Sequence, residues 1–416
     1  MSVQTYSTTI NSGVNKIWRK VQGDVADGLN FKCEEWGLLD EMDDMGLAWS
    51  LREVTFPVDI TEGGRLAQIP EAGYEGIPYT PNAEEVTLTP THYNARFAAS
   101  KLAMWVDKEG GDAQIEKQLK FQGMKAVDTM ARGISDDFYG FSTSILALTD
   151  TDISGTTVTI TLSAGYGLSG ITSTSFIADK FRVNDRVAIL DAGTYRVTGT
   201  VSSITSAAVM VLVLDAAFTT TTNSLQIVRA NAVESTQTSY NRGLTGLLDI
   251  CTSASVQGLS TTSIANWSVA YSDTASGRFS GNKIRLAKDA IANYGPNGAK
   301  PDVCFLSQGV YRDLILGERS SLVQNDAVAL QLDGDVKSRG LQFFKSRRVP
   351  PGYAFVVDRK GFKKWQLLPK PGSKFSWADG KEQIDQSAMV FAIDLPIQTA
   401  VTSRKCFSYF SSQQES

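Results

Sequence analysis

A long polar segment near the N-terminus, TEGGRLAQIPEAGYEGIPYTPNAEE at 61–85, constrains the fold of this chain more than any other stretch. It is rich in Gly and Pro and offers few side chains that could be buried. Two short strand-like runs flank it, REVTFPVDI (52–60) and EEVTLTP (84–90), and we expect them to pair as the arms of a hairpin. Each arm plus half of the tip is about 18 residues, which reach on the order of 60 Å at ~3.3 Å per residue. A compact domain of ~150 residues is only about 45 Å across, so the tip is predicted to leave its own domain.

The composition argues against several classes of function. The chain has 416 residues, enough for two or three domains, and its net charge of −4 is not that of a dedicated nucleic-acid binder. It has a single histidine, His92, and four scattered cysteines without metal-ligand spacing: Cys33, Cys251, Cys304 and Cys406. We expect reduced, mostly buried thiols and a structural histidine. We therefore expect no metal, no cofactor and no catalytic triad, and we do not expect an enzyme.

Targeting signals are also missing from the pattern. The first 20 residues have no apolar core followed by a small-residue cleavage site. The longest apolar run is AAVMVLVL (207–214), far shorter than the roughly 20 residues of a membrane span. The sequence thus predicts a soluble protein that is not secreted.

A long amphipathic helix follows the hairpin. RFAASKLAMWVD (96–107) alternates like a strand, and from Asp112 the apolar period changes to that of a helix through about Phe138. Asp112 can cap the helix after the Gly110–Gly111 break. Only one stripe is apolar, so we expect the helix to lie across a sheet with its other face exposed. The apolar positions are Ile115, Leu119, Val127, Met130, Ile134 and Phe138.

Residues 148–230 differ sharply in composition. Thr, Ser, Gly and Val dominate, charge is sparse, and five short strand patterns are separated by turn signals: 156–162, 185–192, 194–201, 208–214 and 224–228. We interpret this range as an inserted small all-β barrel or sandwich. GYGLSG (165–170) matches the GxGxxG pattern of dinucleotide sites, but no helix is expected after it, and we interpret it as a loop between strands.

An α/β pattern returns after residue 230. SGNKIRLAKDAIANYG (280–295) is an amphipathic helix ended by Gly295-Pro296, PDVCFLS (301–307) a buried strand, and QGVYRDLIL (308–316) a second helix. YAFVVD (353–358) and KKWQLLP (363–369) are predicted strands. The range 389–410 is predicted to form a pair of closing strands.

Two charged blocks of opposite sign stand far apart in the chain. Residues 34–53 are acidic, whereas 337–374 holds eleven Lys and Arg residues against one acid, Asp358. The basic block could be a nucleic-acid patch, a protein–protein surface complementary to the acidic block, or a solvated face. Self-association would join the two blocks.

The order of these pieces resembles the major capsid proteins of tailed double-stranded DNA bacteriophages, with the Hong Kong-97-type fold. ASKLAMWVD leading into the 112–138 helix resembles the strand and spine helix of that family. PDVCFLSQGVYRDLIL resembles its strand-then-helix segment, and RVPPGYAFVVDRKGFKKWQLLP and FAIDLPIQTAVT resemble its closing strands.

The resemblance implies an α+β capsid fold with an inserted barrel, divided as follows: 1–50 an N-terminal arm; 51–95 the extended loop; 96–147 a peripheral domain with the spine helix; 148–230 the inserted barrel; 231–388 an axial domain with connecting strands; and 389–416 the closing strands of the peripheral domain. No Lys occurs between 51 and 100, so the lysine–asparagine cross-link of some members cannot use this loop. No long coiled-coil prefix precedes the arm, which favours a separate scaffolding protein.

The function implied is a shell of pentamers and hexamers around double-stranded DNA, with a portal protein and only weak, non-specific DNA contact. The implied location is the virion capsid, and the host cytoplasm during assembly. The residues expected at contacts between subunits are Glu62, Arg65, Glu71, Tyr74, Glu75, Arg347, Arg348, Lys363 and Lys364. The alternatives are an encapsulin-type nanocompartment shell, an α/β enzyme with a barrel domain, and a DNA-binding structural protein that uses 337–374.

Overall fold

The computed structural model describes residues 15–20, 22, 33–42, 48–49, 53–59, 83–100, 112–222, 224–230, 243–264, 266–296, 298–322, 337–338, 340–366, 376–382 and 388–415. Contacts divide the chain into two compact units. The first comprises 1–39, 90–138 and 364–398, and the second 40–89, 139–363 and 399–416. Neither unit is continuous in sequence, so each is built by segments that return from far along the chain.

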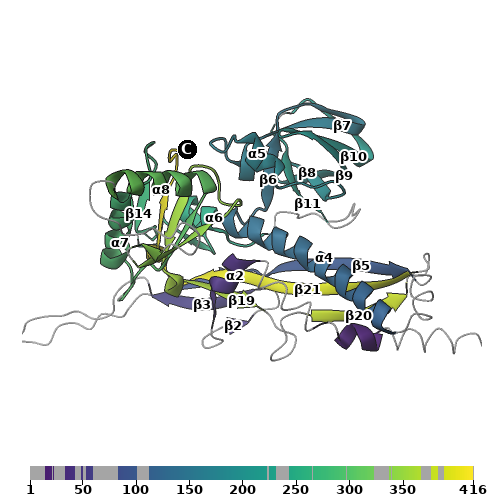
Figure 1. Ribbon diagram of the computed structural model, residues 1–416, viewed down its shortest axis with the longest axis horizontal. Coiled ribbons are helices and arrows are strands. Elements are labelled where there is room, and N and C mark those ends of the chain that lie inside the picture. Colours follow the sequence, from purple (N-terminus) through teal and green to yellow (C-terminus); the bar gives the residue numbers. More distant parts are fainter. Residues whose placement is uncertain are drawn as a thin grey trace, which may run out of the picture. The chain divides into compact units, whose positions relative to one another are not determined.

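The first unit contains a long antiparallel sheet and a long helix (Figure 1). β5 (Thr91–Ser100) pairs with β21 (Ala388–Val401) from Thr91↔Ile397 to Ser100↔Ala388, and β20 (Ser376–Glu382) pairs with the same strand. The expected strand at 96–107 therefore begins earlier, at Thr91. Alternating buried residues of β21 give the sheet its apolar face: Met389, Phe391, Ile393, Leu395 and Ile397.

The N-terminal segment contributes to this core. Residues 15–20 are helical, and Trp18 is fully buried. Its ring lies 5.2 Å from that of Phe97 on β5 and 5.4 Å from that of Phe391 on β21. This aromatic cluster holds part of the predicted arm against the sheet. The short helix α2 (Glu34–Leu38) buries Trp36.

The long helix predicted at 112–138 is confirmed as α4 (Asp112–Tyr139), a 28-residue helix. Of its expected apolar stripe, the described side chains are buried, whereas the expectation of one exposed face holds only for the first half of the helix; the buried residues are Leu119, Val127, Met130, Ile134 and Phe138. Every residue from Met130 to Tyr139 is buried, including Arg132, Asp136 and Asp137. The Tyr93 hydroxyl of β5 donates a hydrogen bond to Asp137, so this buried carboxylate has a polar partner.

The second unit contains the predicted hairpin. β3 (Val54–Asp59) and β4 (Ala83–Leu88) pair antiparallel, with β2 (Ala48–Trp49) on the outer side of β3. Val54, Phe56 and Val58 are buried on one strand, and Val86 and Leu88 on the other. Alternation along both arms therefore gives the hairpin one buried face.

Six strands form a closed barrel, one of the two folds that the sequence predicts for 148–230 (Figure 1). Its strands are β6 (Ile145–Thr149), β7 (Ile153–Ser163), β8 (Arg186–Asp191), β9 (Thr194–Ser206), β10 (Val209–Thr220) and β11 (Gln226–Arg229), arranged in the order β10-β7-β6-β11-β8-β9. The sequence analysis missed β6. Gly165–Gly167 form a 3-10 turn, and the expectation that no helix follows is wrong, because α5 (Thr174–Ala178) does; this helix has only five residues.

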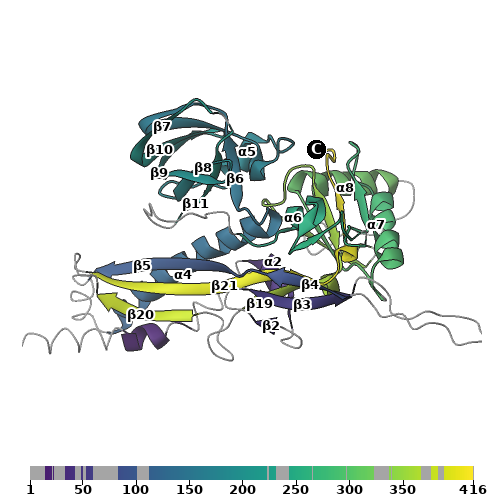
Figure 2. The same cartoon turned by 180° about the vertical axis from the view of Figure 1, so that it is seen from behind.

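The remainder of the second unit contains a six-stranded sheet with helices packed against it. The strand order is β14-β22-β18-β15-β17-β16, with bounds Tyr271–Asp273, Phe407–Phe410, Ala354–Val357, Val303–Leu306, Leu341–Lys345 and Lys337–Ser338. One apolar core contains residues of both α7 (Gly281–Tyr294) and α8 (Gln308–Leu322), which therefore cover the same face of the sheet (Figure 2). The two closing strands predicted at 389–410 exist, but β21 and β22 belong to different sheets.

Short elements complete the second unit. They are α6 (Leu247–Thr252), β12 (Ser255–Val256), β13 (Leu259–Ser260), the 3-10 turns Arg359–Gly361 and Arg404–Cys406, and the strand β1 (Asp40–Glu41). The strand β19 (Phe362–Gln366) spans the division, because 362–363 belong to the second unit and 364–366 to the first.

The C-terminal segment after β22 is fixed by hydrogen bonds. The Gln413 amide donates to the Gly352 carbonyl at 2.9 Å, and the Gln414 amide donates to the Gly277 carbonyl at 2.8 Å. The Gln413 side chain accepts from Lys283 Nζ at 2.7 Å. Gly352 has a φ of 74°, and a Cβ there would lie 3.1 Å from the Gln413 carbonyl oxygen, so both the backbone and the close approach require glycine.

Candidate assembly surfaces

The predicted contact residues fall into three groups. Glu62, Arg65, Glu71, Tyr74 and Glu75 lie at the hairpin tip, outside the described residues. Lys363 and Lys364 lie on β19, half-buried, and Arg347 and Arg348 lie in the turn after β17, the first exposed and the second half-buried. The assignment of all nine to contacts between subunits stays a prediction.

The base of the hairpin is held by one residue that sequence reasoning missed, Gln257. It occupies the two-residue turn between β12 and β13, where Gln257 has a φ of 53° and Gly258 a φ of 86°. Two positive φ values are the signature of the type I′ turns that suit a tight hairpin. The Gln257 carbonyl accepts a hydrogen bond from the Thr87 amide of β4 at 3.1 Å.

The Gln257 side chain binds a third segment. Its Nε2 donates to the Thr399 carbonyl at 2.6 Å, and its Oε1 accepts from the Val401 amide at 3.1 Å. One glutamine therefore connects an arm of the hairpin, the β12–β13 turn and the end of β21. A hairpin with a long tip needs such a fixed base, because any rotation at the base is multiplied along its length.

Some residues of the basic block have contacts within the chain. The guanidinium of Arg359 donates to Asp302, and Lys360 Nζ lies 3.5 Å from the Gly298 carbonyl. Lys345 Nζ lies 5.7 Å from the centroid of the Tyr311 ring. Of these three contacts, only the ion pair of Arg359 with Asp302 neutralises a charge of the block.

Arg348 contacts the inserted barrel. Its Nη1 donates to the Asp179 carbonyl at 3.3 Å, and its own carbonyl accepts from the Tyr166 hydroxyl at 2.9 Å. Tyr166 lies in the 3-10 turn after β7 with a φ of 54°, an uncommon value for a bulky residue. The structure therefore places Arg348 in a contact between the barrel and the turn after β17 of the same chain.

Beside this contact lies a buried lysine. Lys180 is 1% exposed, and its Nζ lies 3.2 Å from the centroid of the Tyr166 ring and 4.5 Å from that of Phe176. A cation over aromatic faces is attracted by their quadrupoles, and the attraction is larger when water is excluded. This interaction stabilises Tyr166 in its strained conformation, with its hydroxyl directed at the Arg348 carbonyl.

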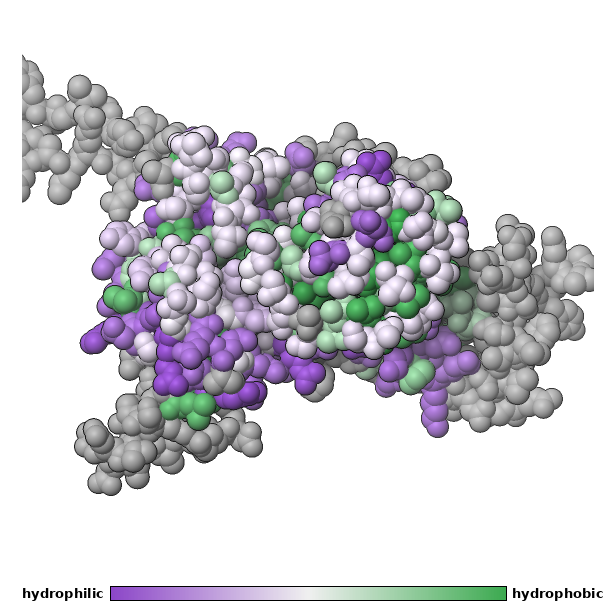
Figure 3. Space-filling model, turned by 90° about the horizontal axis from the view of Figure 1, so that it is seen from above, coloured by the Kyte–Doolittle hydropathy of each residue, from purple (hydrophilic) through white to green (hydrophobic). Residues whose placement is uncertain are grey.

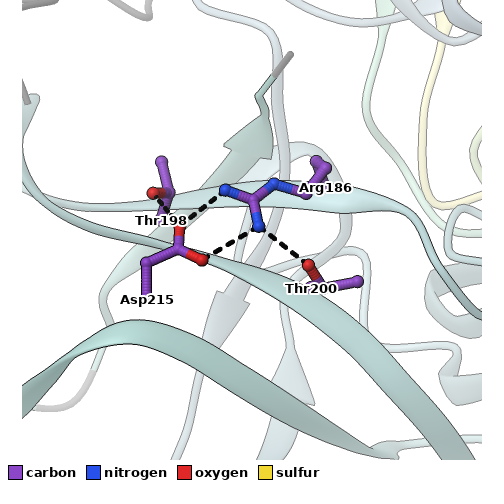
Figure 4. A network of polar contacts seen from close by, with 4 residues as sticks. All are labelled: Arg186, Thr198, Thr200 and Asp215. Atoms are coloured by element: carbon purple, nitrogen blue, oxygen red, sulfur yellow. Dashed lines mark hydrogen bonds and ion pairs between the residues drawn. The ribbon is translucent and has the colours of Figure 1, made fainter. Parts of the chain in front are cut away.

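A polar network links three adjacent strands of the barrel (Figure 4). The guanidinium of Arg186 donates to both carboxylate oxygens of Asp215, at 2.9 and 2.5 Å, and to the Thr200 hydroxyl at 2.9 Å. The Thr198 hydroxyl also donates to Asp215. The pKa of Asp215 is lowered, chiefly by the hydrogen bond from Arg186. Asp215 lies where β10 departs from regular pairing with β7, between Val213 and Phe218, so the network fixes this irregularity.

The described residues show no arrangement for metal or thiol chemistry. Among them, no group of three or more His, Cys, Asp or Glu side chains could hold a metal ion. The four cysteines are free and buried, which confirms the sequence prediction, and burial raises the pKa of Cys251 and of Cys406 to about 12. His92 lies on β5, with its Nε2 3.5 Å from Asp394. Within the described part of the chain, no helix combines the length and apolarity needed to cross a membrane.

Comparison with known proteins identifies the fold. No protein-family model and no curated protein sequence matches the chain. Among solved structures, a chain of the cyanophage A-1(L) capsid matches with a TM-score of 0.52 at 10% identity, over 92% of this chain and 93% of that one. The chain has the fold of a phage capsid protein.

Two further solved structures match this chain with TM-scores below 0.5. The capsid of a native GTA particle matches with a TM-score of 0.44 at 9% identity, over 92% of this chain and 99% of that one. The SrpI encapsulin of Synechococcus elongatus PCC 7942 matches with a TM-score of 0.41 at 8% identity, over 91% of this chain and 86% of that one.

Sequence reasoning missed two contacts, and only one of them is marked by a pattern in the sequence. Gln257-Gly258 between short apolar runs is a turn signal that could have been found. The contact of Tyr166 with Arg348 had none, because it joins residues 182 positions apart.

Proposed function

We propose that this protein is a major capsid protein of the Hong Kong-97 type, which assembles into the pentamers and hexamers of an icosahedral shell around double-stranded DNA. The observation that carries the proposal is the β3–β4 hairpin. Its arms are paired to Asp59↔Ala83, and its base is fixed through Gln257, while the 23 residues between the arms are mostly polar. A tip of this composition gains little by burial in its own chain, so a neighbouring copy is its natural partner.

The shell would be held by many weak contacts. Exposed ion pairs contribute only ~0–1 kcal/mol each, and Glu62, Arg65, Glu71 and Glu75 are our candidates for such pairs with the adjacent subunit. Tyr74 would add apolar contact area, and Arg347, Lys363 and Lys364 would meet acidic residues of a neighbour. Because each contact recurs at every equivalent interface of a closed shell, small energies suffice.

The charge of the chain fits a DNA container. A net charge of −4 leaves the DNA contact weak and non-specific, so the genome could move during packaging. A separate scaffolding protein and a portal protein would be the partners of assembly, the virion would be the final location, and no catalytic step is needed.

The first experiment is expression of the full chain, followed by size-exclusion chromatography and negative-stain microscopy. We expect closed particles, with a co-expressed scaffolding protein where the chain alone does not close. A chain that stays monomeric at every concentration, with the scaffolding protein present, would overturn the proposal.

Two hairpin variants test the role of the tip. Deletion of 61–83 should abolish particles while circular dichroism and melting of the monomer stay unchanged. Replacement of 61–83 by a Gly-Ser segment of equal length retains the reach and removes the specific contacts, so it should also fail to form stable particles. Normal particles from the deletion variant would remove the function that we give to the hairpin.

The runner-up is an encapsulin-type nanocompartment, which would enclose protein rather than DNA. Particles purified from infected or co-expressing cells separate the two: nuclease-protected double-stranded DNA supports the capsid, and a co-purified protein cargo without DNA supports the nanocompartment.

A further inference from the structure

One face of the barrel is formed without charged residues. Neither 153–163, which is β7, nor 199–214, which covers the second half of β9 and the first half of β10, contains Asp, Glu, Lys or Arg, although charged residues make up 20% of the chain. β10 pairs with β9 on one side and β7 on the other, so these segments are contiguous.

The pairing registers place the outward residues in three rungs. Val209 lies between Thr161 and Ser206, Val211 between Thr159 and Ser203, and Val213 between Thr157 and Thr200. Each rung has a valine on β10 with a hydroxyl side chain on either side. We call these nine residues the valine ladder. Its members are exposed or half-exposed, whereas the alternate residues Met210, Leu212 and Leu214 are buried inside the barrel.

At its Thr161 end, the valine ladder borders the exposed Asp150, whose backbone amide donates to the Thr161 carbonyl at 2.9 Å. The charged residues at its Thr200 end, Arg186 and Asp215, form an ion pair with each other (Figure 4). Two large apolar residues on these strands are exposed, Val213 by 44% and Ile204 by 36%. In Figure 3 the barrel lies to the right of centre, and pale and green residues predominate on the surface seen there.

This pattern is complementary to itself. A two-fold axis through the middle strand sets the valine row of one copy against the valine row of another, and hydroxyl rows against hydroxyl rows. Hydroxyls both donate and accept, so identical rows can pair, whereas rows of like charge would repel. A charged partner would instead lose hydration against a face that offers no counter-charge.

The surface area of the ladder determines whether two free copies could associate through it. Three strands ~4.8 Å apart and five residues of ~3.3 Å rise cover on the order of 250 Å² per copy. A stable interface between free proteins buries about 800 Å² per partner. The ladder is therefore too small to hold two free copies together, and it needs other contacts that already bring the copies close.

We propose that the valine ladder is a contact between the barrels of two copies of this chain, formed only in the assembled particle. The inference rests on the proposed shell function and adds to it a specific surface and partner. The barrels thereby stabilise the particle after the other contacts have brought the copies together.

Cross-linking of assembled particles tests this proposal. Val211 is the centre of the ladder, and all four natural cysteines are buried, so in Val211→Cys only the introduced thiol is accessible to a short bis-maleimide. Thr194→Cys, an exposed position at the other end of β9, is the matched control. We expect covalent dimers several-fold more abundant for Val211→Cys than for the control in particles, and none for either variant in the free chain.

The outcomes separate the two proposals. Particles without Val211→Cys dimers overturn the ladder contact and leave the shell function standing, and a cross-link to a different polypeptide overturns it in favour of a decorating partner. Absence of particles under all conditions overturns the shell function and the ladder contact with it. As a second readout, Val211→Lys should lower the temperature at which particles dissociate, with Thr194→Lys unchanged; equal temperatures for both would contradict the proposal.

Discussion

At the scale of single residues, Gln257 is predicted to stabilise the base of the hairpin through its side chain. Gln257→Ala removes both side-chain hydrogen bonds and leaves the Val401 amide and the Thr399 carbonyl without this partner. An unsatisfied buried group costs about 1–3 kcal/mol, so we expect a loss of that order in the free energy of unfolding.

Urea denaturation of the monomer measures this loss. Gln308→Ala, which truncates an exposed glutamine at the start of α8, is the control and should change stability by less than about 0.5 kcal/mol. Equal midpoints for the two variants would show that the Gln257 bonds do not stabilise the hairpin base.

The ionisation of Asp215 makes the stability of the barrel depend on pH. Its pKa is lowered in the folded barrel, chiefly by Arg186, so the carboxylate stabilises the barrel above its unfolded pKa of about 4. This stabilisation is lost as the pH falls through the lower, folded pKa. Asp215→Asn should therefore destabilise the barrel at pH 7, by about 1 kcal/mol because the ion pair is partly exposed to solvent.

Hydrogen exchange in β9 and β10 measures this effect. At pH 7, Asp215→Asn should exchange about fivefold faster than the natural chain, and the difference should shrink below pH 4. Asp152→Asn, an exposed carboxylate in the turn before β7, should match the natural chain at both pH values. A difference that grows on acidification would contradict this account.

At the scale of elements, the C-terminal segment provides two neighbouring glutamines with opposite environments. Gln413 is 4% exposed and bonds to Lys283, to the Ala275 carbonyl and to the Ser411 carbonyl, whereas the Gln414 side chain is exposed. Gln413→Ala should cost about 2 kcal/mol, since one lost bond involves a charged donor, and Gln414→Ala less than about 0.5. Thermal melts of the two variants test this, and equal melting temperatures would contradict it.

The helices and strands differ in how well they could be predicted from the sequence. Strong periodicity predicted α4, α7 and the β3–β4 arms, because burial of one face requires apolar residues at regular intervals in the sequence. The short strand β6 was missed because five residues between a helix and a turn give too little alternation. The assignment of β21 and β22 to separate sheets was also not predictable, because apolar strands of similar composition do not encode their partners.

The candidate site was predicted less completely than the fold. Arg348 was selected for its charge, yet its contacts depend on the left-handed conformation of Tyr166, which local pattern does not reveal in a tyrosine. The valine ladder depends on the registers of β7, β9 and β10, and a shift of one residue would turn every valine inward.

At the scale of the whole molecule, the barrel is expected to be removable. Its first and last strands are neighbours, with Ile145 opposite Val228, so the chain leaves the barrel close to where it enters. Paired residues lie about 5 Å apart, a gap that a short Gly-Ser linker spans. Replacement of 145–229 by such a linker should leave the helix content of the remaining chain intact by circular dichroism. An unfolded or aggregated product would show that the barrel is required for the fold of the rest.

The sequence separation of β5 and β21 determines when their sheet can form during synthesis. Ser100 lies opposite Ala388, so 288 residues separate the two strands that complete this sheet. At a translation rate of roughly 5–20 residues per second, β5 would wait on the order of 15–60 s for its partner strand to leave the ribosome. A nascent chain thus cannot finish this sheet until its synthesis is nearly over.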